Sequence, residues 1–255
     1  MAIDISNRPD RPVRKVIISG RRRHGITSDL LKLIAVVAMV IDHIAWAFVP
    51  FGSPAGQTMH IIGRLTAPIM CFMVAQGYYK TRNVKKYAQR LGIFALISHF
   101  PYVFFESGEF QIIHQTSVMY PLFLGVIALI IRDSPKYKTA VKNMIILLIC
   151  LAAMLGDWGS LAVIWIMIFA ERQSRTEQIK HFCIASIIYI ILDILLSSVS
   201  GQWYNDLFRL GVFLAVPLLL KYNGVRKGGK AYKWFFYVFY PAHLLLLAVI
   251  KYIIL

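Results

Sequence analysis

Nine apolar stretches separated by short polar connections run from residue 28 to the end of the chain, and they constrain its fold more than any other feature. The stretches cover residues 28–50, 60–79, 87–106, 117–132, 141–155, 158–170, 180–197, 206–221 and 234–254. Most are near the length that a helix needs to cross the hydrocarbon of a bilayer. The sequence therefore predicts an all-α, polytopic transmembrane bundle of about nine spans, with roughly eight to ten as the range.

The fifth and sixth stretches are short, and residues Asp157-Trp158-Gly159 form the hinge between them. Two arrangements are open for this pair: a tight hairpin that crosses the bilayer, or a partly re-entrant segment.

Composition agrees with a membrane protein, since 58% of the residues are apolar, 16% are charged and the mean hydropathy is +0.62. The formal net charge of +16 is explained by basic loops at one membrane face, so no nucleic-acid partner is expected. Such loops suit anionic lipid headgroups or a phosphorylated cofactor. The three cysteines, Cys71, Cys150 and Cys183, are isolated within spans and lack metal-ligand spacing, so no metal is expected.

Lys and Arg alternate between loops, which predicts the orientation of the bundle. The tail and every second loop together hold 24 of the 28 basic residues, whereas the intervening loops hold none. By the positive-inside rule, the N-terminus is cytoplasmic and the C-terminus is external. Residues 1–27 are expected to be a basic, disordered cytoplasmic tail, and residues 28–255 a single transmembrane domain.

The first span carries the costliest residues, because Lys32 lies at its basic end and Asp42-His43 lie deep within it. An ionisable residue inside the membrane is a functional hypothesis by default. Lys32 and His43 are eleven residues apart, so they differ by only roughly 20° around a helix axis and by ~16.5 Å along it. This geometry suits an enzyme that holds a charged donor at one face and reacts its far end within the bilayer.

Other spans place polar side chains at comparable depth, and these form one cluster if the helix faces meet. The further candidates are His60, Arg64, His99, Asp193, Arg209 and His243, with Asp157 in the hinge.

Structural roles are the alternative for these polar residues. Asp42 and Asp193 are candidates for buried ion pairs with Arg64 or Arg209. His60 and Arg209 are candidates for snorkelling to the interface. His99 and His243 are candidates for hydrogen-bonded core residues.

Several blocks, taken in order, resemble the TraX family of polytopic inner-membrane proteins. They are Asp29-Leu-Leu-Lys32, Met39 to Ile44, Ile62 to Pro68, Gly77 with Thr81-Arg82, Tyr87 to Phe94, Ser98 to Tyr102, Asp157 to Gly159 and Phe239 to Leu244. The namesake activity of the family is N-terminal acetylation of conjugative pilin. The resemblance implies a multi-pass protein of the bacterial inner membrane that transfers an acetyl group from acetyl-CoA to an acceptor presented at the membrane.

The spacing of Asp29, Lys32 and His43 is also similar to the first-helix signature of type-three membrane acyltransferases. In those proteins a basic residue, usually Arg, and a His are separated by ten residues, and the His is taken as catalytic. This likeness implies a catalytic role for His43, the residue that its depth within the first span also selects.

Together these features predict an acetyl-CoA-dependent acyltransferase. Its donor site would lie near Lys32, with Asp29, Lys80, Arg82 and Arg90 as the other candidate residues. His43 would act as general base, oriented by Asp42, and Arg64 would stabilise the oxyanion. The acceptor is an amine or hydroxyl of a pilin-like peptide or an envelope glycan.

Two other functions use the same residues. A proton-coupled transporter would employ the Asp and His side chains as a relay, and a non-catalytic pilus or envelope assembly protein would employ them in packing. Only the acyltransferase converts acetyl-CoA to free CoA, and only the transporter shows uptake driven by a pH gradient.

Overall fold

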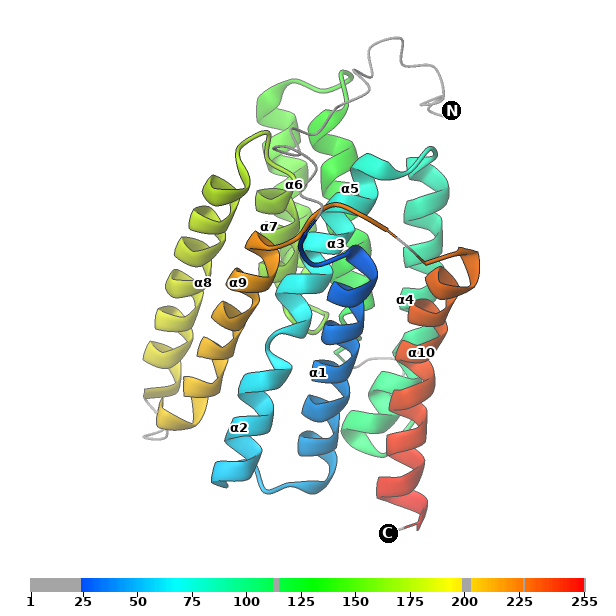
Figure 1. Cartoon of the computed structure of the whole chain (residues 1–255), viewed down its shortest axis with the longest axis vertical. Coiled ribbons are helices and arrows are strands. Elements are labelled where there is room, and N and C mark those ends of the chain that lie inside the picture. Colours follow the sequence, from blue (N-terminus) through cyan, green and yellow to red (C-terminus); the bar gives the residue numbers. More distant parts are fainter. Residues whose placement is uncertain (1–23, 112–114, 199–202, 227, 255) are drawn as a thin grey trace.

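The computed structural model describes residues 24–111, 115–198, 203–226 and 228–254, and these residues form a bundle of helices (Figure 1). In chain order the elements are α1 (Ser28–Phe48), α2 (Pro54–Gly63), α3 (Thr66–Lys80), α4 (Val84–Ser107), α5 (Met119–Asp133), α6 (Thr139–Ala153), α7 (Gly159–Phe169), α8 (Arg175–Ser198), the 3-10 helix η1 (Trp203–Leu214), α9 (Ala215–Leu220), α10 (Lys230–Val249) and the π-helix η2 (Ile250–Ile254). The predicted all-α class is confirmed for the described part of the chain.

Each predicted span corresponds to one helical rod, and three of the rods are composite. The second combines α2 and α3, the eighth η1 and α9, and the ninth α10 and η2. Within the described residues, four rods are long and apolar enough to cross a membrane: Ser28–Phe48, Pro54–Lys80, Arg175–Leu196 and Trp234–Ile254. These rods indicate a multi-pass membrane protein, while the number of nine crossings and the orientation remain predictions.

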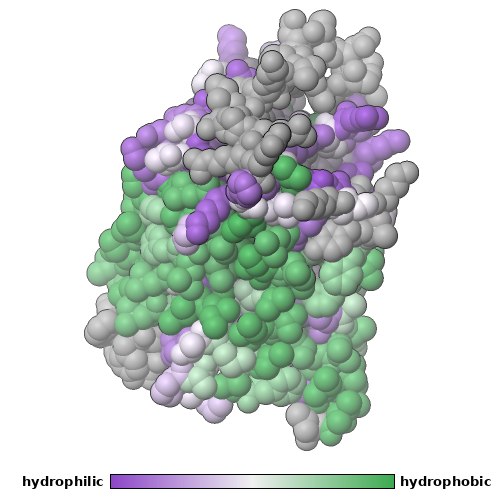
Figure 2. Space-filling view, in the orientation of Figure 1, coloured by the Kyte–Doolittle hydropathy of each residue, from purple (hydrophilic) through white to green (hydrophobic). Residues whose placement is uncertain are grey.

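The basic loops gather toward one end of the bundle. In Figure 1 the α3–α4, α5–α6 and α7–α8 connections lie at the top, and the α1–α2 connection lies at the bottom. Figure 2 shows, on the face in view, a broad apolar band across the middle of the bundle and hydrophilic side chains above it. Large apolar side chains on α6 and α8 point outward, among them Leu147, Leu148, Ile188 and Leu192. Exposed apolar surface of this extent matches a lipid environment.

Helix α7 forms the centre of the bundle, where it packs against α3, α5, α6 and α8. Its side chains Trp165, Ile166 and Phe169 are almost fully buried. With 11 residues it extends only about 16.5 Å, roughly half of the hydrocarbon thickness. This length favours the re-entrant alternative for the α6–α7 pair over a complete crossing.

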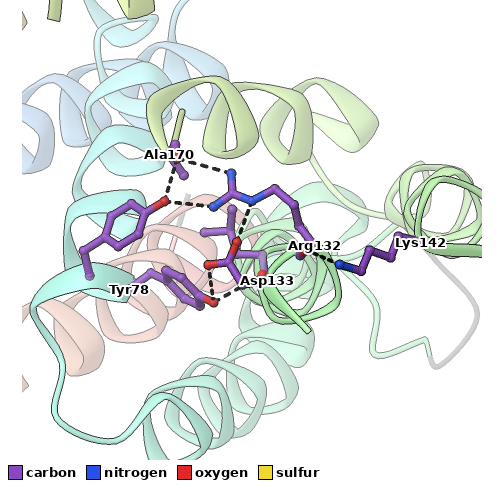
Figure 3. Close-up of polar contacts among 7 residues, drawn as sticks. Tyr78, Arg132, Asp133, Lys142 and Ala170 are labelled. Atoms are coloured by element: carbon purple, nitrogen blue, oxygen red, sulfur yellow. Dashed lines mark hydrogen bonds and ion pairs between the residues drawn. The ribbon is translucent and has the colours of Figure 1, made fainter. Parts of the chain in front are cut away.

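A polar network ties α3, α5, α6 and α7 together at the basic end (Figure 3). Arg132 donates to Asp133 at 3.0 Å, to the Tyr79 hydroxyl at 2.8 Å and to the Ala170 carbonyl at 3.2 Å. Tyr78 donates to Asp133, and Lys142 Nζ donates to the Arg132 carbonyl. Because these buried or half-buried charges are paired with one another, the network stabilises helix packing and leaves ligand binding to other basic residues.

The segment before α1 is hydrogen-bonded to the α9–α10 connection. Ile26 N donates to the Lys221 carbonyl, Asn223 N to the Ile26 carbonyl and Ser28 N to the Val225 carbonyl, at 2.9–3.0 Å. The predicted disordered tail, residues 1–27, lies mostly outside the described residues. Its last four residues, 24–27, are described, and their hydrogen bonds place them with the folded domain.

Candidate functional site

Helix α1 carries one wall of the site. Thr27 caps its N-terminus by accepting a hydrogen bond from Leu30 N, and the apolar sequence then continues for 21 residues. Ser28 and Lys32 line one cavity, and Val36, Met39 and His43 line a second one. Successive lining positions are three to four residues apart, so they form a single stripe. The helix therefore presents Lys32 and His43 to two adjacent cavities, on the single face that their spacing predicts.

The first cavity, which we call the basic cavity, has a volume of about 250 Å³. The second, which we call the histidine cavity, has a volume of about 60 Å³. Four side chains line both cavities: Met70, Met119, Leu122 and Phe236. Because they share these walls, the two cavities are neighbours, one at the basic end of the bundle and the other at His43.

The imidazoles of His43 and His243 form a hydrogen-bonded pair between α1 and α10. His243 Nδ1 lies 2.9 Å from the Phe239 carbonyl oxygen, which only accepts hydrogen bonds, so this nitrogen carries a proton. In the neutral ring, Nε2 is then an acceptor. His43 Nδ1 lies 2.8 Å from that Nε2 and donates to it. The Nε2 of neutral His43 is therefore unprotonated, and its lone pair is available as a base.

Asp42 faces a different set of partners. Its carboxylate accepts a hydrogen bond from Arg64 Nη2 and lies 2.8 Å from His60 Nδ1. All three side chains are buried. A Cβ added at Gly63 would overlap the Asp42 side chain, so the glycine allows this close approach of α1 and α2. The ion-pair alternative for Asp42 and Arg64 describes this arrangement, and the hydrogen-bond partner of the His43 ring is His243.

Arg64 is held between two aromatic rings and does not line the histidine cavity. Its guanidinium carbon lies 4.9 Å from the Trp158 ring centre and 5.0 Å from that of Phe208. Both contacts are in the range of a cation–π interaction. Arg64 thus supports Asp42 and packs against the hinge, and the geometry does not direct it toward an oxyanion in the histidine cavity.

Asp157 is brought to the histidine cavity by the hinge between α6 and α7. Its backbone N donates to the Thr116 carbonyl at 2.8 Å, and the next residue, Trp158, has a left-handed backbone with φ of 66°. That conformation is strained for a bulky residue and is common at functional sites. The structure gives the Asp157 carboxylate no salt bridge within the described residues. It is thus a carboxylate that shares a cavity with His43.

The remaining polar candidates lie apart from this cavity. His99 Nδ1 hydrogen-bonds with Thr116 Oγ1 at 3.0 Å. Asp193 forms an ion pair with Arg209 Nε at 2.6 Å, which joins α8 to η1, and Arg209 also contacts Asp206. These contacts correspond to the structural alternatives for His99, Asp193 and Arg209.

Among the residues that the structure describes, the basic cavity is lined by the four cations Lys32, Lys80, Arg90 and Arg226 and by no carboxylate. Lys80 Nζ donates to the Tyr222 hydroxyl at 2.9 Å and to the Gly224 carbonyl at 3.2 Å. A cavity with four positive charges and several hydroxyl and amide groups is suited to a ligand with phosphate groups.

Two of the residues predicted for the donor site, Asp29 and Arg82, do not line the basic cavity. Arg82 is exposed and does not line the basic cavity. Asp29 accepts a hydrogen bond from Gly228 N at 2.7 Å, which fastens the α9–α10 connection to the start of α1. Arg226 lines the basic cavity but is not among the residues predicted for the donor site. It is one of several basic residues in a loop whose charge the positive-inside rule already explains.

No metal site accompanies this arrangement in the part of the chain that the structure describes, since no group of three or more His, Cys, Asp or Glu side chains is placed to hold an ion.

Comparison with known proteins identifies the family. Residues 27–251 match the TraX protein family. This chain belongs to the TraX family. It is 31% identical over 233 residues to the "Probable fimbrial assembly protein FimC, serogroup H1" of Dichelobacter nodosus, which covers 87% of this chain and 94% of that protein. It is also 42% identical over 59 residues to "Uncharacterized protein RP591" of Rickettsia prowazekii (strain Madrid E), or 22% of each chain. No solved structure matches the chain.

The blocks that carry the TraX resemblance converge in space. His43, Asp157 and Tyr240, from three separate blocks, line the histidine cavity together. Arg64 packs on Trp158, and His243 contacts His43. Residues of four sequence blocks that are far apart in the chain thus meet around one small cavity.

Proposed function

We propose that this TraX-family protein is an integral-membrane acyltransferase of the bacterial inner membrane, which transfers an acetyl group from cytoplasmic acetyl-CoA to an amine or hydroxyl of a membrane-presented acceptor. The observation that carries the proposal is that a cavity lined by four cations adjoins a second cavity lined by His43. A donor with phosphate groups and a long arm suits this arrangement, with its phosphates at the cations and its reactive end at the His43 base.

The donor's phosphates bind in the basic cavity. Lys32, Lys80, Arg90 and Arg226 approach it from α1, α3, α4 and the α9–α10 connection. Charge-assisted hydrogen bonds to phosphate are stronger than neutral ones. Lys32 and His43 are separated by ~16.5 Å along α1, so the donor's arm extends past the shared apolar wall to bring the thioester to His43.

His43 acts as the general base. As the acceptor nitrogen or oxygen attacks the thioester carbon, His43 Nε2 takes its proton. The bond between the carbonyl carbon and sulfur then breaks, and the imidazolium returns the proton to the departing thiolate. The products are the acetylated acceptor and free CoA, and the enzyme is restored without a metal or redox step.

The acceptor binds on the Asp157 side of the histidine cavity. Four cations line the basic cavity, whereas two carboxyl side chains, Asp42 and Asp157, line the histidine cavity together with His43. This polarity separates an anionic donor from an acceptor amine. Either a peptide amine or a glycan hydroxyl is compatible with a base at His43.

A second function is favoured by one observation. The homologue from Dichelobacter nodosus is named a probable fimbrial assembly protein, so a non-catalytic role in pilus or envelope assembly is the other candidate. In that case the His and Asp side chains serve packing, and acetyl-CoA is not consumed.

The decisive experiment is turnover by the purified protein in lipid nanodiscs. Release of free CoA from acetyl-CoA, with a short apolar peptide bearing a free N-terminal amine as acceptor, should depend on the protein and on His43. Peptides and glycans from cells with and without the protein should differ by the mass of one acetyl group. Absence of CoA release with peptide and glycan acceptors would leave the assembly role.

A further inference from the structure

We infer that His243 is a positioning residue that fixes the tautomer of His43, an inference that rests on the proposed acyl transfer. The two rings come from opposite ends of the chain, 200 residues apart, and their nitrogens lie 2.8 Å from each other. Their centres are 5.0 Å apart. A general base needs its lone pair on the nitrogen that faces the substrate, so the partner of the other nitrogen controls whether the base functions.

His43, His243 and the Phe239 carbonyl form a chain of two hydrogen bonds, which we call the relay. The carbonyl at its end fixes which group donates in each bond. The Phe239 carbonyl accepts from His243 Nδ1, so the neutral His243 ring offers only its Nε2 lone pair to His43. His43 Nδ1 must then hold its own proton, which leaves Nε2 free of one. If His243 were the opposite tautomer, it would force the proton of His43 onto Nε2 and remove the base.

The relay orients the base without passing a proton onward. A backbone carbonyl takes no proton under these conditions, so His243 has nowhere to send a second one. The single proton that moves during transfer therefore travels between the acceptor, His43 Nε2 and the leaving thiolate. His243 acts through His43 and touches no reacting atom.

Packing holds both rings in the required orientation. The Phe239 ring stacks on His243 at 5.1 Å and 8°, and Tyr240 approaches the same ring edge-on at 5.7 Å. The edge contact of Phe105 with His43 is 5.4 Å between ring centres. Aromatic contacts on each ring restrict its rotation, so the hydrogen bond persists in one geometry.

Two substitutions separate positioning from packing. In His243→Gln the side-chain oxygen can accept from His43 Nδ1 while the amide nitrogen donates to the Phe239 carbonyl, so both hydrogen bonds are retained. In His243→Leu the volume is similar and both bonds are lost. His99→Leu is the matched control, because it makes the same change at a histidine that contacts Thr116 away from the cavity.

The assay is acetyl transfer by the full chain in nanodiscs, with acetyl-CoA and the free-amine peptide. We expect His243→Leu to lower kcat by about 10- to 100-fold, the effect typical of losing a group that orients a functional histidine. The KM for acetyl-CoA should not change, and His99→Leu should match the wild type. His243→Gln should recover most of the lost rate. Wild-type kcat in His243→Leu, or equal losses in the Gln and Leu variants, would overturn the inference.

A spectroscopic measurement keeps the inference testable apart from turnover. In protein labelled with ¹⁵N-histidine, His43 should show a protonated Nδ1 and an unprotonated Nε2, and His243→Leu should convert it to a mixture of tautomers. A His43 ring protonated on Nε2 in the wild type would refute the relay. If the expected tautomer is found but His43→Ala still transfers acetyl groups, the acyltransferase mechanism fails and the relay is reduced to a packing contact.

Discussion

Replacement of His43 by alanine tests the reactive group directly. A general base contributes roughly 10²- to 10⁴-fold in rate, so His43→Ala should lose transfer by that factor. Donor binding should survive, because the cations of the basic cavity begin ~16.5 Å away along α1. That separation exceeds the ~7–10 Å within which substitutions usually influence each other. The variant should therefore bind CoA with the wild-type dissociation constant while its kcat collapses.

The assay pairs two measurements on one nanodisc preparation. Release of free CoA gives kcat, and calorimetric titration with CoA gives the dissociation constant. His99→Ala is the control, since His99 bonds to Thr116 and does not line the histidine cavity. Near-normal transfer by His43→Ala, with intact binding, would refute the reasoning and place the base on another helix. Loss of CoA binding in the same variant would refute the separation of donor and reaction sites.

Three further perturbations address the donor site, the buried ion pair and the orientation. Lys32→Ala should weaken CoA binding by about 1.5–3 kcal/mol, and Lys32→Arg much less, as measured by the same titration. Asp42→Asn should lower the unfolding free energy by about 3–5 kcal/mol, because it leaves the Arg64 guanidinium buried without its counter-charge, and a shifted thermal unfolding curve in detergent would report it. A reporter fused after Leu255 should be external and one inserted within residues 221–233 cytoplasmic; the same side for both would contradict the predicted orientation.

The helices were predictable because each is a local apolar pattern between polar connections, and the nine predicted segments match nine rods. The boundaries that differ have local causes. The second rod begins at Pro54 instead of residue 60, since Ser53 caps the helix by accepting from Gly56 N and Pro54 suits a first turn. Arg64 and Leu65 interrupt the same rod between α2 and α3.

The sequence predicts how deep each site residue lies along its helix, but not how each helix is rotated about its own axis. Counting residues from the basic face places Asp42 and His43 in the outer half of the first span and His243 near the middle of the ninth, whereas their partners depend on how each helix turns about its axis. That rotation follows from contacts between segments 200 residues apart, such as His43 with His243. Sequence periodicity indicates which residues share one helix face, and it contains no information about which faces meet.

The way the charges are paired explains why a neutral histidine remains as the reactive group. A charge buried in a membrane protein is costly, and a partner of opposite charge lowers that cost. The carboxylate of Asp42 has that partner in Arg64, and His60 completes its hydrogen bonds, so none of the three is free to exchange a proton with a substrate without breaking the cluster. His43 Nδ1 contacts the neutral ring of His243, and His43 gains its positive charge only transiently, in a cavity that Asp42 and Asp157 also line. The base can therefore cycle between its two states while the ion pair between α1 and α2 stays intact.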